Sequence, residues 1–152
     1  MSLKRAIYQH TETSGVDAGE STAGVAARPL DHEEYNAIGA VLNPDGSVTA
    51  PPGLWVLKGW TISNAWGGHR TILDVAGEQY TGRSGSNTDE SEIARGNNSV
   101  NEVTTRPLFF SEPTTISLRQ YVERTDTLPD ALGKATGSGH SEVYAGLEII
   151  EA

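Results

Sequence analysis

Histidine side chains are the first candidates for acid–base or metal chemistry in this chain. The four histidines, His10, His32, His69 and His140, lack the i, i+4 spacing and the HExxH pattern that place two rings on one metal ion. Folding into a sheet could still bring two of them together. We expect surface or turn histidines, and the sequence predicts no metal site.

Two glycine-containing stretches resemble catalytic loops only in part. In TGRSGS, residues 81–86, a G-x-S-x-G nucleophile elbow would need glycine where Ser86 stands, and no strand-to-helix pattern follows. In GKATG, residues 133–137, the glycines and lysine lack the order of a phosphate loop. We predict no catalytic residue and no cofactor. A small β-sandwich hydrolase is the alternative, because the fold, not the spacing, sets carboxylate pairs in a sheet enzyme.

Oxygen ligands for calcium occur in two places. Asn43, Asp45 and Ser47 alternate like the start of a calcium loop, but glycine falls at the fourth position, and a hairpin turn explains these residues better. The acidic cluster at residues 89–92 fits a solvated loop that keeps an oligomer soluble. A calcium ion in a crevice between subunits is the alternative for that cluster.

Three tryptophans could contact a sugar or a protein partner. Trp55 and Trp60 have opposite parity on one expected strand, so we expect one in the core and the other at a subunit interface. Trp66 stands beside Gly67-Gly68 at the end of that strand. It is therefore the candidate for an exposed docking or ligand contact, with ordinary packing as the alternative.

Composition narrows the class of protein. At 152 residues the chain fits one domain with a real core, and the absence of cysteine excludes disulfides and thiol chemistry. A formal net charge of −9, with no basic run longer than Lys4-Arg5, opposes binding to nucleic acid through a broad basic face. No stretch is apolar enough for a signal peptide or a membrane span, so we expect a soluble protein.

Short apolar runs separated by glycine, proline and small polar residues predict an all-β domain. A short helix is expected only at residues 31–39, where Asp31 and Glu34 have the spacing of a capping box. Polar loops are expected at 83–99 and 125–141. The expected strands are residues 5–10, 24–30, 37–42, 47–50, 54–65, 69–76, 78–82, 100–110, 114–124 and 143–150.

The C-terminal segment HSEVYAGLEIIEA is unusual because both faces of its strand are apolar. Val143, Leu147 and Ile149 alternate onto one face, while Tyr144 and Ile150 fall on the other. Chain ends are usually solvated unless a sheet holds them. The pattern therefore predicts a strand in the middle of a sheet, with one face toward the core and the other toward a neighbouring subunit.

Six stretches, taken in order, resemble the trimeric TNF-like (complement globular-head) jelly rolls of bacteriophage virion proteins. They are AIYQH, ARPLDHEEYN, APPGLWVLKGWTIS, GHRTILDV, TTISLRQYVE and EVYAGLEII, and they span nearly the whole chain. The resemblance implies one domain over residues 1–152, an antiparallel jelly-roll β-sandwich of about ten strands. It also implies a homotrimer whose C-terminal strand lies near the threefold axis. Lys58 within the central strand and the loop after Gly82 depart from the family pattern.

The same resemblance suggests interface residues and a role. We expect Trp60, Tyr121, Tyr144 and Ile149 at the trimer interface, with Gly146 allowing close approach of a neighbouring chain. A chain with no length left for a stalk is expected to be a non-enzymatic capsid decoration or head-spike protein. It would be made in the host bacterial cytoplasm and bound to the major capsid protein lattice of the virion. The alternative is a receptor-binding or carbohydrate-binding tip that contacts a host surface glycan.

Overall fold

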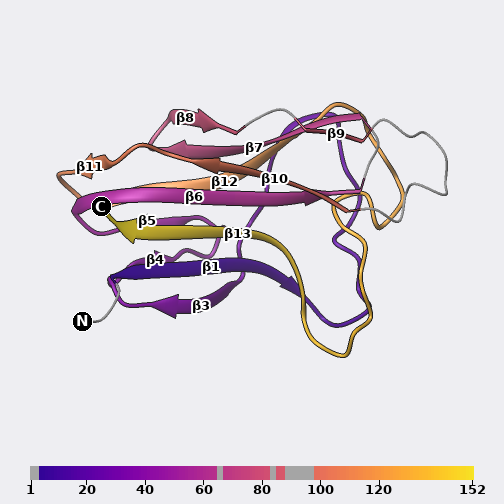
Figure 1. The fold of residues 1–152 in the computed structure, drawn as a ribbon, viewed down its shortest axis with the longest axis horizontal. Helices are drawn as coiled ribbons and strands as arrows, with labels where there is room; N and C mark the ends of the chain where they lie inside the picture. The colour runs from indigo at the N-terminus through magenta and orange to yellow at the C-terminus, as the bar shows by residue number, and fades with distance from the viewer. Residues whose placement is uncertain (1–3, 65–66, 83–84, 88–97) are drawn as a thin grey trace.

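Two antiparallel sheets packed face to face make up the protein in a computed structural model, which describes residues 4–64, 67–82, 85–87 and 98–152 (Figure 1). The described residues contain no helix and 13 strands. The bounds are β1 Arg5–Glu12, β2 Gly24–Ala27, β3 His32–Asn36, β4 Val41–Leu42, β5 Val48–Ala50, β6 Gly53–Ser63, β7 Gly67–Val75, β8 Glu78–Thr81, β9 Gly85–Asn87, β10 Ser99–Thr104, β11 Leu108–Phe110, β12 Thr114–Val122 and β13 Glu142–Glu151.

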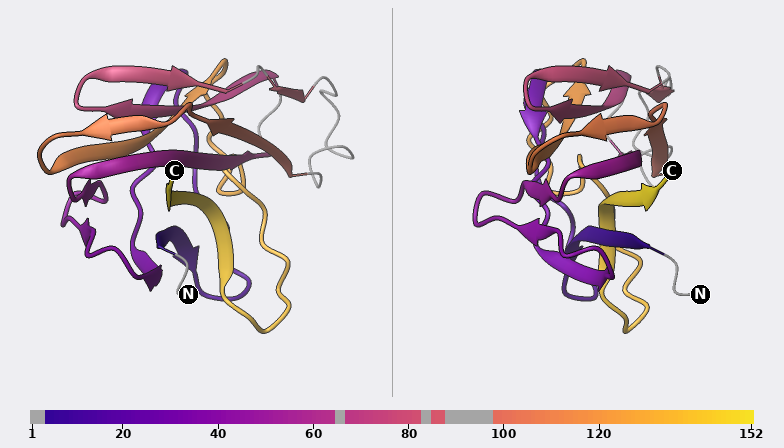
Figure 2. Two further views of the ribbon diagram at one scale, coloured as in Figure 1. Left: turned by 60° about the vertical axis from the view of Figure 1, so that its left-hand side comes forward. Right: turned by 90° about the vertical axis from the view of Figure 1, so that its left-hand side faces the viewer.

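Strand order places β6 and β13 in the middle of the first sheet. That sheet runs β10-β6-β13-β1-β3, and β11 also pairs with β6. The second sheet runs β4-β5-β12-β7-β8, with β2 paired to β12 and β9 paired to β7. Figure 2 shows the two layers from the side and end-on, and in Figure 1 the first sheet faces the viewer. The all-β antiparallel sandwich predicted from the sequence is confirmed.

Alternation along β6 is the reason that it can lie at the centre of a sheet. Trp55, Leu57 and Thr61 are buried between the sheets, whereas Trp60 and Ile62 are half-buried on the opposite face. The remaining core side chains come from both sheets and are mostly aliphatic or small. They include Ala6, Tyr8, Val48, Leu73, Ile116, Leu118, Leu147 and Ile149.

The helix expected at residues 31–39 was a wrong prediction. Residues 32–36 form the edge strand β3, which pairs with β1 and so uses its backbone groups in a ladder. Asp31 caps no helix, because its Oδ1 accepts hydrogen bonds from the backbone N–H and the hydroxyl of Thr11, at 2.9 and 3.1 Å. Asn36 closes the turn that follows, where its Oδ1 accepts from three backbone N–H groups of residues 38–40.

The C-terminal strand lies where the sequence predicted it, in the middle of a sheet. Antiparallel pairing joins β13 to β1 on one side and to β6 on the other. A β-bulge interrupts the β1 ladder between His10 and Thr11, so that Tyr144 has no partner across the strand. Arg5 stands opposite Ile150, and the two ends of the chain therefore lie at the same end of the sandwich (Figure 1).

Candidate interaction surfaces

Two of the predicted interface residues belong to the interior of the subunit. Ile149 is fully buried in the core between the sheets. Tyr144 is 2% exposed, and its hydroxyl donates a hydrogen bond of 2.7 Å to the carbonyl of Val16. Because these side chains have no surface left in the single chain, they cannot bury more against a neighbour. Their assignment to the interface is corrected to core packing.

Gly146 has no side chain at the position where the ring of Trp60 packs within the same chain. The two residues are directly opposed on β13 and β6. A methyl group added to Gly146 would collide with the indole ring of Trp60, so the ring lies over the glycine. The space expected for a neighbouring chain is therefore filled by Trp60 itself. Trp60 remains half-buried, and its other side stays a predicted contact for a neighbour.

The outward face of the first sheet carries a band of apolar side chains, which we call the association surface. The band crosses the adjacent strands β10, β6, β13 and β1, and no described segment crosses in front of its middle in Figure 1. Every member is half-buried or exposed in the single chain. The association surface consists of Ile7, Val56, Trp60, Ile62, Val100 and Ile150. Leu54 and Phe109 continue it toward one end, and Phe109 is 74% exposed.

Charges on the association surface are paired within the chain. Lys58, which the sequence singled out as an interruption of the central strand, lies 3.5 Å from the carboxylate of Glu102. Arg5 donates to Glu148 at 3.1 Å, and its guanidinium stands 5.9 Å from the ring of Tyr35. The surface is therefore apolar with neutralised charges rather than basic or acidic.

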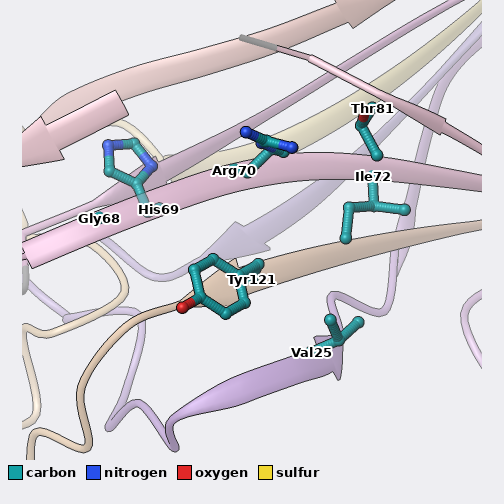
Figure 3. Close-up of a pocket in the computed structure, with 7 residues that line it drawn as sticks. All are labelled: Val25, Gly68, His69, Arg70, Ile72, Thr81 and Tyr121. Carbon is teal, nitrogen blue, oxygen red and sulfur yellow. The ribbon is translucent and has the colours of Figure 1, made fainter. Parts of the chain in front are cut away.

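Tyr121, the remaining predicted interface residue, lies on the other sheet. It is 39% exposed on the outward face of β12, opposite Arg70 of β7 and Val25 of β2. A pocket of about 360 Å³ opens beside it (Figure 3). The pocket is lined by Val25, Gly68, His69, Arg70, Ile72, Thr81 and Tyr121. Tyr121 therefore cannot share one flat contact with Trp60, and its interface role stays a separate prediction.

Trp66 lies outside the described residues, as does the acidic cluster at 89–92. The docking contact and the calcium alternative therefore stay predictions. The other calcium candidate is a turn. The Oδ1 atom of Asp45 accepts from the backbone N–H and hydroxyl of Ser47, at 3.0 and 2.6 Å, between the paired strands β4 and β5.

The glycine-rich stretch at residues 133–137 binds an anion that the chain supplies itself. The carboxylate of Glu142 accepts from the backbone N–H groups of Thr136 and Gly137, at 3.0 and 2.8 Å, and from that of Gly15. These donors hold the pKa of Glu142 below its usual range. The loop therefore docks onto the start of β13, and these N–H groups are not open to a phosphate.

One buried histidine contacts a serine, but the pair lacks the parts of a catalytic site. The Nε2 atom of His69 lies 2.7 Å from the hydroxyl of Ser99, and its buried Nδ1 has no hydrogen-bond partner among the described residues. A triad needs an acid on that nitrogen. Burial lowers the pKa of His69, which favours the neutral ring. Among the described residues, no group of three or more His, Asp or Glu side chains is placed to hold a metal ion.

Arg28 is a buried cation that sequence reasoning missed. It is 3% exposed, and its guanidinium donates to Gln120 Oε1 at 2.6 Å and to the carbonyl of Tyr144 at 3.1 Å. Burial lowers its pKa to about 10. Its carbonyl partners also include Ile62 and Leu132, so Arg28 ties both sheets to the loop before β13. Arg28 follows the short strand β2, whose residues are mostly exposed, so the sequence around it offered no signal of burial.

The described residues include no helix that is long and apolar enough to cross a membrane.

Comparison with solved structures places this arrangement among known jelly rolls. The globular domain of zebrafish complement 1qA protein superimposes with a TM-score of 0.60 at 11% identity, covering 99% of this chain and 97% of that chain. The Eiger TNF of S. frugiperda gives 0.60 at 12% identity, covering 100% and 94%. Murine APRIL gives 0.53 at 10% identity, covering 98% and 100%.

No family model matches the sequence, and no curated protein sequence matches it. At such low identities the structural likeness speaks for the fold alone. The two antiparallel sheets, their strand content and these superpositions agree with one another. The chain therefore has the jelly-roll fold shared by TNF and complement C1q globular domains.

Proposed function

We propose that the protein is a non-enzymatic structural protein that acts as a homotrimer. Its role would be to decorate a bacteriophage capsid, as a decoration or head-spike protein on the major capsid protein lattice, after synthesis in the host bacterial cytoplasm. The association surface is the observation that carries self-association. The phage role is supported by the sequence resemblance to virion jelly rolls.

Self-association would remove the association surface from water. Apolar side chains on four adjacent strands form one band, and its burial would be favourable by roughly 25 cal/mol per Å² of apolar area. Lys58 and Arg5 already have acidic partners on the same face, so a neighbouring copy can cover them without leaving an unpaired charge. Obligate interfaces of this type commonly bury more than about 2,000 Å² in total.

The first experiment is light scattering on the purified protein. We expect a mass near three times 16.2 kDa. Ile150→Glu places a new charge in the association surface and should give monomers. Val41→Glu, an equal change at an exposed apolar residue of the second sheet, is the matched control and should leave the trimer intact. A monomeric wild-type protein, or an Ile150→Glu trimer of unchanged stability, contradicts the proposed interface.

Capsid decoration needs its own test. The protein would be mixed with undecorated capsids and sedimented, and we expect it to pellet at a fixed ratio to the capsid protein. A stable trimer that stays in the supernatant would contradict decoration while leaving self-association in place.

A second candidate function is receptor or carbohydrate binding, and the pocket beside Tyr121 favours it. Binding sites of proteins are concave and mainly apolar with a few polar groups, as this pocket is. The test is binding to purified host polysaccharide, compared between the wild type and the Tyr121→Ala and Trp66→Ala variants. Unchanged binding by both variants would contradict a site at either residue.

A further inference from the structure

The pocket of the second sheet has an apolar floor and open walls. Ile72 forms part of the floor and is 4% exposed, although it points to the outward face of the sheet. Val25 and Tyr121 stand on one side of β7, and Thr81 of β8 stands on the other (Figure 3). The volume of about 360 Å³ falls within the range of ligand pockets, roughly 300–1,000 Å³. The site is large enough for one ring.

Arg119 neighbours this apolar floor in the β-ladder, although it is not one of the residues that line the pocket. It is directly opposite Ile72 in the β12–β7 ladder and lies two residues before Tyr121, so it shares their face of the sheet. Its side chain is half-buried and has no hydrogen bond or ion pair with any described residue. Arg70, opposite Tyr121, does line the pocket.

Acidic side chains on the same face lie toward the two ends of the site and are engaged elsewhere. Glu123 accepts a hydrogen bond of 2.6 Å from the backbone N–H of Gly68. Asp74 accepts one of 2.9 Å from the backbone N–H of Gly77. Neither is an ion-pair partner of Arg119. In a chain with a net charge of −9, an arginine that pairs with no described residue and lies near an apolar pocket is a local exception that suits an anion.

We propose that this pocket binds a ring-sized ligand that has an apolar face and one carboxylate group. Tyr121 and Val25 contact the apolar face, and Ile72 supports it from below. Arg119 binds the carboxylate, because the planar guanidinium matches carboxylate geometry in two parallel hydrogen bonds. Uronic-acid sugars and aromatic acids share this chemistry. The inference rests on the second candidate function and specifies its site and ligand class.

Backbone amide shifts in NMR titrations test the proposal with four probes. Glucuronate and methyl glucoside form the sugar arm, and phenylacetate and benzyl alcohol form the aromatic arm. We expect at least one acid to shift the amides of Val25, Ile72 and Tyr121 more strongly than its neutral counterpart. Arg119→Gln should weaken binding of that acid roughly tenfold. Arg106→Gln removes the same charge at an exposed site between β10 and β11 and should have no effect.

Each outcome separates the inference from the function on which it rests. A response to glucuronate alone supports both, and a response to phenylacetate alone supports the site but not a glycan ligand. Equal responses to acid and neutral probes overturn the inference, and so does an acid response that survives Arg119→Gln. Silence of these amides with all four probes also overturns it. If the protein still binds host polysaccharide in that case, carbohydrate binding stands at another surface.

Discussion

At the scale of single residues, the interior is held together by polar groups that find unusual partners. Arg28 has no carboxylate partner among the described residues and instead donates to Gln120 and three backbone carbonyls. Glu142 pairs with no cation in the part of the chain that the structure describes and is held by backbone N–H groups. In both cases a charged side chain hydrogen-bonds to backbone groups. It therefore holds loops in place instead of forming an ion pair.

Gly146→Ala should destabilise the fold because the indole of Trp60 occupies the space of the new methyl group. Overpacking of this kind costs about 1–3 kcal/mol in the free energy of unfolding. Urea denaturation followed by tryptophan fluorescence would measure it. The double variant Gly146→Ala, Trp60→Val should recover part of the loss. Additive losses in the double variant would show that the two residues do not compete for space.

We expect the buried side chain of His69 to make the protein less stable in mild acid. Because burial lowers the pKa of His69, the unfolded chain binds a proton below about pH 6.5 that the folded chain does not. The contribution of His69 to the free energy of unfolding is therefore fully present above that pH. It is lost as the pH falls toward the pKa of His69 in the folded chain. His69→Gln should reduce this dependence in urea denaturation at about pH 7.5 and 5.5. His140→Gln, at an exposed position, is the control. If His69→Gln and the wild type had the same pH dependence, His69 would not be the cause of the loss of stability.

At the scale of elements, β13 organises the molecule because it joins three kinds of contact. Its core face packs between the sheets, its outward face contributes Ile150 to the association surface, and Glu142 at its start holds the preceding loop. Arg28 also binds the carbonyl of Tyr144 within the strand. A change in the loop before β13 should therefore also alter the structure at the β-bulge.

Glu142→Gln tests the anchoring of that loop. An amide keeps the shape but loses the charge that the backbone N–H groups of Thr136, Gly137 and Gly15 favour. We expect faster amide hydrogen exchange at residues 136–137 and faster proteolysis there. In the wild type the same loosening should occur as the pH falls through the lowered pKa of Glu142. Glu151→Gln, in an exposed ion pair with Lys4, is the matched control. Equal exchange in both variants would contradict the anchoring role.

At the scale of the whole molecule, a trimer makes folding and assembly one equilibrium. If subunits associate through the association surface, the thermal midpoint should rise with protein concentration. Calorimetry over a range of protein concentrations measures this. The Ile150→Glu variant should have a midpoint that does not depend on concentration. A concentration-independent midpoint for a wild-type protein of trimeric mass would mean that subunits remain associated when they unfold.

The sequence predicted the layers of the fold better than the details of the surfaces. Alternation in β6 depends on burial alone, so this strand was predicted with the correct faces. In β13 the predicted alternation fits residues 145–150, whereas Tyr144 is buried and Val143 is half-buried. The helix predicted at residues 31–39 was wrong because strand pairing with β1 outweighed the local capping preferences. Ile149 was assigned to an interface because alternation shows which residues share a face but not which face the same chain covers. Tyr144 was assigned there because the sequence does not show the β-bulge opposite it. The cluster of Tyr121, Val25 and Arg119 joins strands distant in sequence, which no local pattern reveals.

The pairing of the first strand with the last also determines how the molecule responds to force. Arg5 and Ile150 begin an antiparallel ladder at one end of the sandwich, so a pull applied between Lys4 and Ala152 acts across the strands. Their hydrogen bonds would then break one pair at a time, like a zipper, instead of all resisting together in shear. A single subunit should therefore be mechanically soft along this direction, and neighbouring copies pressed against the same strands would stiffen it.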